Sequence, residues 1–338
     1  DVVTKSLRFN RSDDPILSET FSSSSTTDNG KKWTLSMWVK PAEFGEVRTL
    51  FHVRAYPDYF WIRLQDDDTL FMLDRYHATD QPSITTTAKL RDPASFYHMV
   101  FVYDSPNSTV ADRMQIWING ERQSVTASAY DIPQDRVSRP FTAEIHRFMQ
   151  SSATSHGNGA GFLSDIYGVD GLALTPTSFA EEDATTGQWK PKAFSGTYGT
   201  NGFHLDFEDD TAIGNDVSGN NNDFTATTNL AASDVVEDTP TDNYCVYNEI
   251  FSGASGLSEG NLKCTTTARG TFDAMSFASY WEIEANTTSV VGGVISEGGT
   301  ANTVAVTNGR PCGLRLAAEG GMEDTTTGSR RSANGGPW

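Results

Sequence analysis

Three things are scarce in this 338-residue sequence: cysteine, long apolar runs and basic residues. The three cysteines, Cys245, Cys264 and Cys312, lie in the last hundred residues, and an odd number cannot pair fully within one chain. We expect them to remain thiols, so the core and not disulfides must stabilise the N-terminal region. No segment approaches the roughly 20 apolar residues of a membrane helix, which predicts no membrane insertion.

Basic residues are outnumbered by acidic ones. The chain has 25 Lys and Arg against 44 Asp and Glu, a formal net charge of −19. Nucleic-acid binding without sequence preference relies on Lys and Arg that meet phosphates, so this charge argues against a nucleic-acid partner. It would also repel anionic membrane surfaces. The excess carboxylates can supply ligands to Ca²⁺, but composition alone specifies no site.

Short alternating segments and turn residues are abundant instead. Residues 34–39 and 59–64 alternate apolar and polar side chains, which is typical of strands with one buried face. Residues 98–103 are apolar on both faces, as in a central strand of a sandwich. After residues 114–118 comes Asn119-Gly120, a dipeptide that predicts a tight hairpin. These patterns predict an all-β sandwich.

Helical signal is confined to residues 175–182. There Pro176 could open a turn, and Ser178 and Glu181 have the spacing of a capping box. From residue 210 to 243 the sequence is rich in Asn, Asp, Thr and Ser, and a further strand-like segment follows at 280–284. We therefore predict a sandwich over residues 1–205, a connector over 206–243 and a partial second β module over 244–338.

Four segments, taken in order, resemble a known family. They are residues 33–41 (WTLSMWVKP), 97–103, 116–121 and 162–167. This order is similar to that of laminin-G-like, concanavalin A-like jelly rolls, except that Tyr97 stands where tryptophan is usual. The resemblance implies a jelly-roll sandwich in the N-terminal part of the chain.

Later segments resemble something narrower. Residues 203–207 lead into the Asn- and Asp-rich stretch 215–224, and residues 280–284 resemble the core strand of a SPRY-type sandwich. We associate this order with structural and fibre proteins of tailed bacteriophages, especially marine ones. The resemblance implies a virion surface protein, either a tail fibre or a capsid decoration. Its expected partners are other virion proteins, copies of itself (by analogy a trimer) and host surface glycans, at the virion surface or outside the cell.

Aromatic residues provide one candidate site. Sugar rings pack on aromatic faces, so exposed tyrosines and tryptophans could form a platform for a glycan. The candidates surround the second hairpin or lie on the 114–118 segment: Tyr56, Tyr59, Trp61, Tyr76 and Trp117. The same rings could instead fill the sandwich or a subunit interface, and both interpretations stay open.

Oxygen-rich loops provide a second candidate, for Ca²⁺. Laminin-G-like and pentraxin-like relatives often bind Ca²⁺ through loop carboxylates, so the resemblance implies such a site. The candidates are Asp216, Asn220, Asn222 and Asp223, then Asp165 and Asp170, and also 66–68. If Ca²⁺ binds, the chain could be a secreted, calcium-dependent lectin-like module. Alternatively, these residues simply form solvated turns.

A glycoside hydrolase is the third hypothesis. Glucanases of related fold carry acidic residues at alternate strand positions, and Asp206 with Glu208, or Glu282 with Glu284, has that spacing. The catalytic strand of those glucanases needs a third acidic residue on the same face. After Glu208 the next same-face residue is Asp210, followed by turn-like residues, and Glu284 is followed by Ala285-Asn286-Thr287. The six histidines are scattered and none lies beside a plausible nucleophile. We therefore expect a non-enzymatic protein, with Asp206 and Glu208 at a solvent-facing strand edge.

Overall fold

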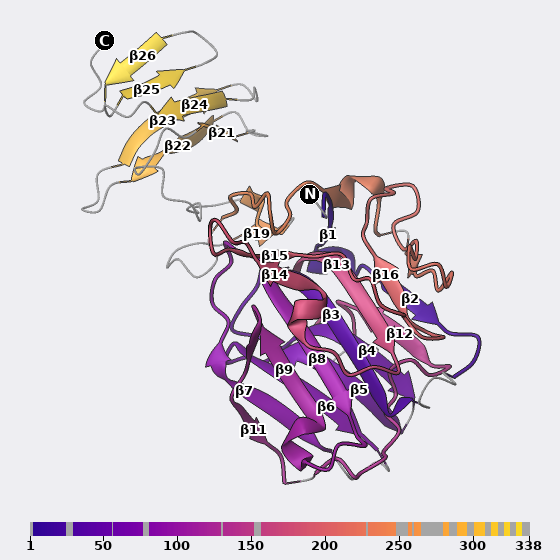
Figure 1. Cartoon of the computed structure of the whole chain (residues 1–338). Coiled ribbons are helices and arrows are strands. Elements are labelled where there is room, and N and C mark those ends of the chain that lie inside the picture. Colours follow the sequence, from indigo (N-terminus) through magenta and orange to yellow (C-terminus); the bar gives the residue numbers. More distant parts are fainter. Residues whose placement is uncertain are drawn as a thin grey trace. The chain divides into compact units, whose positions relative to one another are not determined.

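The computed structural model describes residues 3–24, 30–55, 57–76, 81–129, 131–151, 157–227, 229–247, 256–258 and 260–264, and the backbone of six later strands. Its contacts divide the chain into two compact units, Asp1–Thr271 and Phe272–Trp338. The first unit is a sandwich of two antiparallel eight-stranded sheets (Figure 1). The predicted all-β sandwich is therefore confirmed.

The first sheet has the strand order β10-β9-β8-β3-β13-β1-β18, and β16 also pairs with β13. The bounds of its strands are β1 Ser6–Phe9, β3 Lys32–Pro41, β8 Tyr97–Asp104, β9 Met114–Ile118, β10 Glu121–Arg122, β13 Gly161–Asp170, β16 Phe203–Leu205 and β18 Val235–Val236. The second sheet has the order β11-β7-β6-β5-β4-β12-β2-β17. Its strands are β2 Leu17–Thr20, β4 Arg48–Ala55, β5 Asp58–Leu64, β6 Thr69–Arg75, β7 Ser83–Lys89, β11 Val125–Ala127, β12 Ile145–Phe148 and β17 Thr225–Ala226.

One apolar core fills the space between the sheets. Leu35 and Met37 of β3 and Phe60 and Ile62 of β5 are at most 1 % exposed. They alternate with side chains that point away from the core, as the period of two requires. The indole of Trp33 lies at the centre and stacks on the ring of another core residue, Tyr103, with 5.6 Å between ring centroids.

A segment that follows β13 covers the outer face of the first sheet. It holds the 3₁₀ helix η4 (Pro176–Ser178) and the paired strands β14 (Ala180–Glu182) and β15 (Trp189–Pro191), which overlie this sheet in Figure 1. Ala180 packs in one buried cluster with Trp38 and Phe162, whose side chains point outward from β3 and β13. This cover explains why β13 is buried on both faces.

The local sequence patterns predict the hairpin correctly but not the capping box of the helix. Asn119 and Gly120 have φ values of 49° and 84° and connect β9 to β10, as predicted. Pro176 does open a turn, but this turn is a three-residue 3₁₀ helix preceded by Thr175, and Ser178 caps nothing. The predicted capping box is wrong because the chain already continues as strand β14 at Ala180.

The remaining helices of the described residues are also short. They are the 3₁₀ helices η1 (Arg11–Asp13), η3 (Val110–Asp112) and η5 (Ala232–Asp234). In this part of the chain no helix has the length and apolarity to cross a membrane.

Residues 206–243, expected to be a connector, contribute to both sheets. β17 pairs with β2, and β18 pairs with β1. The ammonium of Lys40, 1 % exposed, donates hydrogen bonds to Asp238 Oδ2 (2.9 Å), Asn243 Oδ1 (2.8 Å) and the Tyr244 carbonyl (2.7 Å). The expected boundaries at residues 205 and 243 thus differ from the contact division, which places the whole stretch in the first unit. The same unit ends with the short β19 (Leu257–Ser258) and β20 (Lys263–Cys264).

The second unit is also built of antiparallel strands. One sheet has the order β21-β24-β25-β26, and β22 pairs with β23. The bounds are β21 Tyr280–Ile283, β22 Ser289–Ile295, β23 Ala301–Thr307, β24 Cys312–Leu316, β25 Gly321–Asp324 and β26 Ser329–Ser332. The expected strand near residue 280 is present as β21, and the SPRY-like assignment stays a prediction.

Candidate functional site

The outer face of the second sheet brings together side chains that are far apart in the sequence. The strand registers place Tyr59 opposite Arg75, Trp61 opposite His52, and Arg63 opposite Phe71. All these residues lie on the side of the sheet that points away from the core, because Phe60 and Ile62 between them point inward. We call this surface the arginine–aromatic face and define it by His52, Arg54, Tyr59, Trp61, Arg63, Phe71, Arg75 and Arg147.

Guanidinium groups and rings alternate across this face. The Arg63 guanidinium lies 4.6 Å from the ring centroid of Trp61 and 4.6 Å from that of Phe71. Arg75 lies 5.0 Å from the ring of Tyr59, whose own ring meets that of Trp61 edge-on at 6.0 Å. Such cation–π contacts hold long side chains against the sheet, so the arginines are partly ordered before any ligand arrives.

Burial separates the rings that a ligand could touch from those that support them. Trp61 is 4 % exposed and donates its Nε1 hydrogen to Thr49 Oγ1 at 3.2 Å. Tyr59, Arg63 and Phe71 are half-buried, so part of each remains at the surface. Trp61 therefore supports the Arg63 guanidinium from below, while Tyr59 is the aromatic residue best placed to contact a ligand.

Three of the arginines on this face lack an ion-pair partner among the described residues. No carboxylate of the described residues lies at ion-pair distance from Arg54, Arg63 or Arg147. The Nε atom of Arg63 and the Nε and Nη1 atoms of Arg147 are buried and have no hydrogen-bond partner there. Burial lowers the pKa of both Arg63 and Arg147; the nearby charge of Asp66 opposes this shift at Arg63, and that of Arg54 lowers the pKa of Arg147 further.

Three other predicted aromatics do not join this site. Tyr56 lies outside the described residues. Tyr76 is 7 % exposed, and its ring is covered by the Arg136 guanidinium at 4.1 Å. Trp117 is half-buried on β9 of the other sheet, where its Nε1 donates to Gln115 Oε1 at 3.1 Å. Hence Tyr59 and Trp61 come together and the other described candidates do not.

The loop expected to hold Ca²⁺ is organised by its own hydrogen bonds. Asp216 Oδ1 accepts from the backbone N–H groups of His204 (2.8 Å) and Ser218 (2.9 Å). Its Oδ2 accepts from Ser218 Oγ and from the Asn222 N–H, both at 2.9 Å. A carboxylate offers about four lone-pair positions, so Asp216 has none left for a cation in this arrangement.

The remaining calcium candidates are also engaged with protein groups. Asp223 Oδ1 accepts from the Asp216 N–H at 2.9 Å, and the side-chain amides of Asn220 and Asn222 donate to the Gly202 carbonyl. Of residues 66–68, Asp67 Oδ1 accepts from the Thr69 N–H (3.1 Å) and Oγ1 (2.6 Å), and Asp68 Oδ1 accepts from the Gly45 N–H at 2.8 Å. Two more candidates lie on β13. Buried Asp165 pairs with His204 Nε2 at 2.8 Å, and Asp170 Oδ2 accepts from the Asn201 N–H at 3.1 Å.

Among the residues that the structure describes, no three acidic, histidine or cysteine side chains form a metal cluster. The calcium site stays a prediction.

Asp206 and Glu208, the first carboxylate pair of the hydrolase hypothesis, do not share a strand face. β16 ends at Leu205, so Asp206 and Glu208 lie in the following loop, where Asp206 Oδ1 accepts from the Glu208 N–H at 3.1 Å. Phe203, Leu205 and Phe207 are buried, as expected for the inward side of this edge. Glu282 lies in β21, whose side chains are not described, and Glu284 lies outside the described residues.

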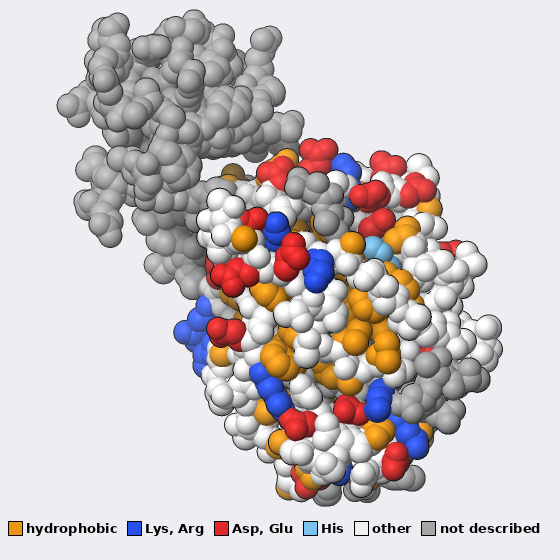
Figure 2. Space-filling view, viewed as in Figure 1, with side chains coloured by type: hydrophobic (Ala, Val, Ile, Leu, Met, Phe, Trp, Pro, Cys, Tyr) orange, Lys and Arg blue, Asp and Glu red, His pale blue; other side chains and the backbone are white. Residues whose placement is uncertain are grey.

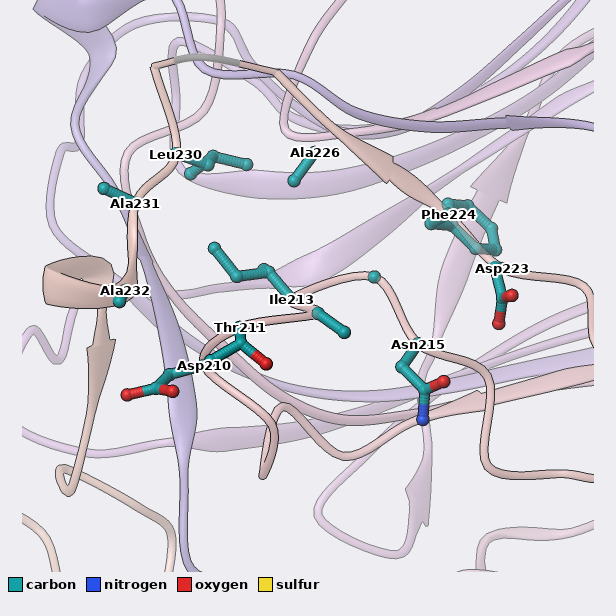
Figure 3. A pocket seen from close by; sticks show the side chains of 12 residues that line it. Asp210, Thr211, Ile213, Asn215, Asp223, Phe224, Ala226, Leu230, Ala231 and Ala232 are labelled. Carbon is teal, nitrogen blue, oxygen red and sulfur yellow. The ribbon is translucent and has the colours of Figure 1, made fainter.

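Two other surfaces complete the survey. A pocket of about 420 Å³ lies beside β17, with Asp210 and Asp223 at opposite ends and Ile213 between them (Figure 3). Its centre is apolar and brings no acid–base pair together. Figure 2 shows apolar side chains gathered in the middle of the face that carries η4, β14 and β15, with charged ones mostly around the edge. The arginine–aromatic face belongs to the other sheet.

Comparison with known proteins finds a family whose model matches part of the chain. The family described as the concanavalin A-like lectin/glucanases superfamily matches residues 18–147. No curated protein matches the chain.

Among solved structures, a native heptameric SAP-like pentraxin from Limulus polyphemus is similar, with 15 % identity and a TM-score of 0.36 over 52 % of this chain and 79 % of that chain. A Bacteroides ovatus protein proposed to bind carbohydrate has 13 % identity and a TM-score of 0.43 over 67 % of this chain and 58 % of that chain. The sialidase module CBM40 of Ruminococcus gnavus, bound to α2,3 sialyllactose, has 10 % identity and a TM-score of 0.33 over 47 % of this chain and 90 % of that chain. Residues 18–147 are thus similar to the concanavalin A-like lectin/glucanases superfamily, and the two-sheet sandwich is consistent with the jelly-roll fold of that family.

Proposed function

We propose that the chain is a non-catalytic carbohydrate-binding protein and that a glycan lies across the arginine–aromatic face. The observation that carries the proposal is the half-buried ring of Tyr59, held edge-on against Trp61 and flanked by the Arg75 guanidinium. A sugar presents apolar C–H groups and hydroxyls side by side. The ring can pack against the first, and guanidinium N–H groups can donate to the second.

The site supports binding better than hydrolysis. Glycoside hydrolysis by the usual route needs two carboxylates placed on either side of the scissile bond. The outward positions of β4, β5, β6 and β12 carry no Asp or Glu. A glycan on this face would therefore meet donors and rings but none of the paired carboxylates that this route needs.

The test compares two half-buried aromatic residues that lie on opposite sheets. Tyr59→Ala removes the proposed platform, and Trp117→Ala removes the alternative one on β9. We expect Tyr59→Ala to weaken binding to a panel of immobilised polysaccharides at least about tenfold, since aromatic anchors commonly carry 2 kcal/mol or more. Trp117→Ala should bind as the wild type does.

Thermal unfolding of both variants supplies the control for folding. Binding that is lost in Trp117→Ala and kept in Tyr59→Ala would move the site to the first sheet. A wild type that binds no polysaccharide of the panel would refute the proposed function.

We further propose that the chain binds glycans as part of a virion surface or in the extracellular space. Support comes from the order of jelly-roll and later segments, which resembles that of bacteriophage structural and fibre proteins. In that setting the chain would assemble with copies of itself, as a trimer, and with other virion proteins, and it would contact host surface glycans. Light scattering with negative-stain imaging tests this setting. A stable trimer or filament is expected, whereas a compact monomer would favour the secreted lectin-like module.

A further inference from the structure

The charge of the arginine–aromatic face is opposite to that of the molecule. The chain carries a formal net charge of −19. Yet Arg54, Arg63, Arg75 and Arg147 all point outward from one sheet, and no carboxylate occupies an outward position of the strands that carry them. A basic surface on an acidic protein is a local feature that the overall composition conceals.

Two of these arginines repel each other, and no acidic side chain of the described residues pairs with either. Arg54 and Arg147 lie on the paired strands β4 and β12, and the charge of Arg54 lowers the pKa of Arg147. Like charges in this position are unfavourable unless a counter-charge approaches. The unpartnered Nε atoms of Arg63 and Arg147 are donors for which the described residues supply no acceptor. An anion bound here would balance this charge through the guanidinium N–H groups that remain at the surface.

The spacing of the arginines favours an extended anion over a small one. They lie on four adjacent strands, in the order β6, β5, β4 and β12. Strands in a sheet are about 4.8 Å apart, so the four charges spread over roughly 14 Å. A single small anion would meet only one or two of them. A polymer with repeated acidic groups would meet all four and could still pack its rings on Tyr59.

We infer that the arginine–aromatic face selects acidic polysaccharides, which carry carboxylate or sulfate groups, over neutral ones. This inference rests on the proposed function and adds the class of ligand. Guanidinium groups bind carboxylate and sulfate oxygens through paired N–H donors, and the supporting rings keep them in place. The overall negative charge would oppose a polyanion everywhere else, so the face also fixes where such a ligand can bind.

The experiment uses three polymers with one backbone: dextran, carboxymethyl dextran and dextran sulfate. Binding of the full chain is measured by calorimetry at several salt concentrations. The wild type should bind both acidic polymers at least about tenfold more tightly than dextran, and this preference should shrink as salt rises. Equal binding of all three would overturn the inference and leave the proposed function standing.

The variant Arg63→Gln/Arg147→Gln tests the location. It should lose at least about tenfold in affinity for the acidic polymers and a clearly smaller factor in affinity for dextran. The matched control is Arg91→Gln/Arg122→Gln, which changes net charge equally and lies in a loop and on β10 of the other sheet. Equal losses in both double variants would mean that only net charge matters, which would also overturn the inference.

Three further measurements keep the outcomes distinct. If the Gln double variant unfolds, the exposed Arg54→Gln variant takes its place, because that side chain contributes little to packing. Duplex DNA carries the same charge without sugar rings exposed for stacking. If the chain binds DNA as tightly as dextran sulfate, the ligand class would be a nucleic acid and not a polysaccharide, and the inference would be overturned. Loss of acidic-polymer binding in Tyr59→Ala as well would tie the selectivity to the proposed site.

Discussion

At the scale of single residues, Lys40 shows how one buried charge joins distant parts of the chain. Its ammonium is almost fully enclosed and meets Asp238, whose side chain is 4 % exposed. Burial lowers the pKa of Lys40 and raises that of Asp238, and each charge opposes the shift of the other. The pair is stable because two further oxygens, from Asn243 and Tyr244, complete the hydrogen bonds of the ammonium.

Lys40→Met should therefore destabilise the protein strongly. The change leaves the Asp238 carboxylate buried without a counter-charge, which typically costs about 3–5 kcal/mol in the free energy of unfolding. Lys5→Met is the matched control, since Lys5 pairs with Glu237 at the surface and such pairs contribute about 1 kcal/mol or less. Urea unfolding measures both. Equal effects of the two substitutions would contradict the role of Lys40 as a buried anchor.

At the scale of elements, the loop that follows β16 is held by the Asp216 carboxylate. Asp216→Asn replaces one accepting oxygen by a donating NH₂ group that faces backbone N–H or hydroxyl donors. We expect a loss of about 2–3 kcal/mol in the free energy of unfolding. The exposed Asp210→Asn provides the control, with a change near zero.

The wild type and Asp216→Asn also test whether the loop binds calcium. With all four hydrogen-bonding positions of Asp216 occupied, the thermal midpoint of the wild type should be the same in Ca²⁺ and in a chelator. A midpoint that rises with Ca²⁺ in the wild type, and not in Asp216→Asn, would instead show that the loop binds the metal.

The strands that position the candidate site could be predicted from the sequence, but the site itself only in part. Alternation identifies 59–64 as a strand and puts Tyr59 and Trp61 on one face. The arginines were missed because each comes from a different strand. Their meeting depends on the registers of β4, β6 and β12, which local patterns do not determine. A search for arginines in phase with Tyr59 would have found Arg63 alone.

At the scale of the whole molecule, the Asn- and Asp-rich stretch illustrates the limit of composition. Residues 206–243 have few large apolar side chains, which predicts a surface connector. The structure places Phe224 and Leu230 in the main core and adds β17 and β18 to the sheets. A few apolar residues at the right positions suffice to dock such a segment. The strands that pair with β17 and β18 are β2 and β1, near the start of the chain. Residue composition cannot reveal strand pairings between segments so far apart in the sequence.

The whole molecule also presents two contrasting faces. The face of the first sheet is covered by its own later segment, whereas the second sheet keeps its arginines and rings partly exposed. The central claim is that this second face binds glycan.

Arginine side-chain NMR tests the claim most directly, by following the Nε–H signals of the full chain while dextran sulfate is added. The account predicts that the signals of Arg63 and Arg147, whose Nε atoms have no partner in the described structure, shift on binding, while those of Arg91 and Arg122 stay in place. Binding that shifts only Arg91 or Arg122, or none of these signals, would contradict it.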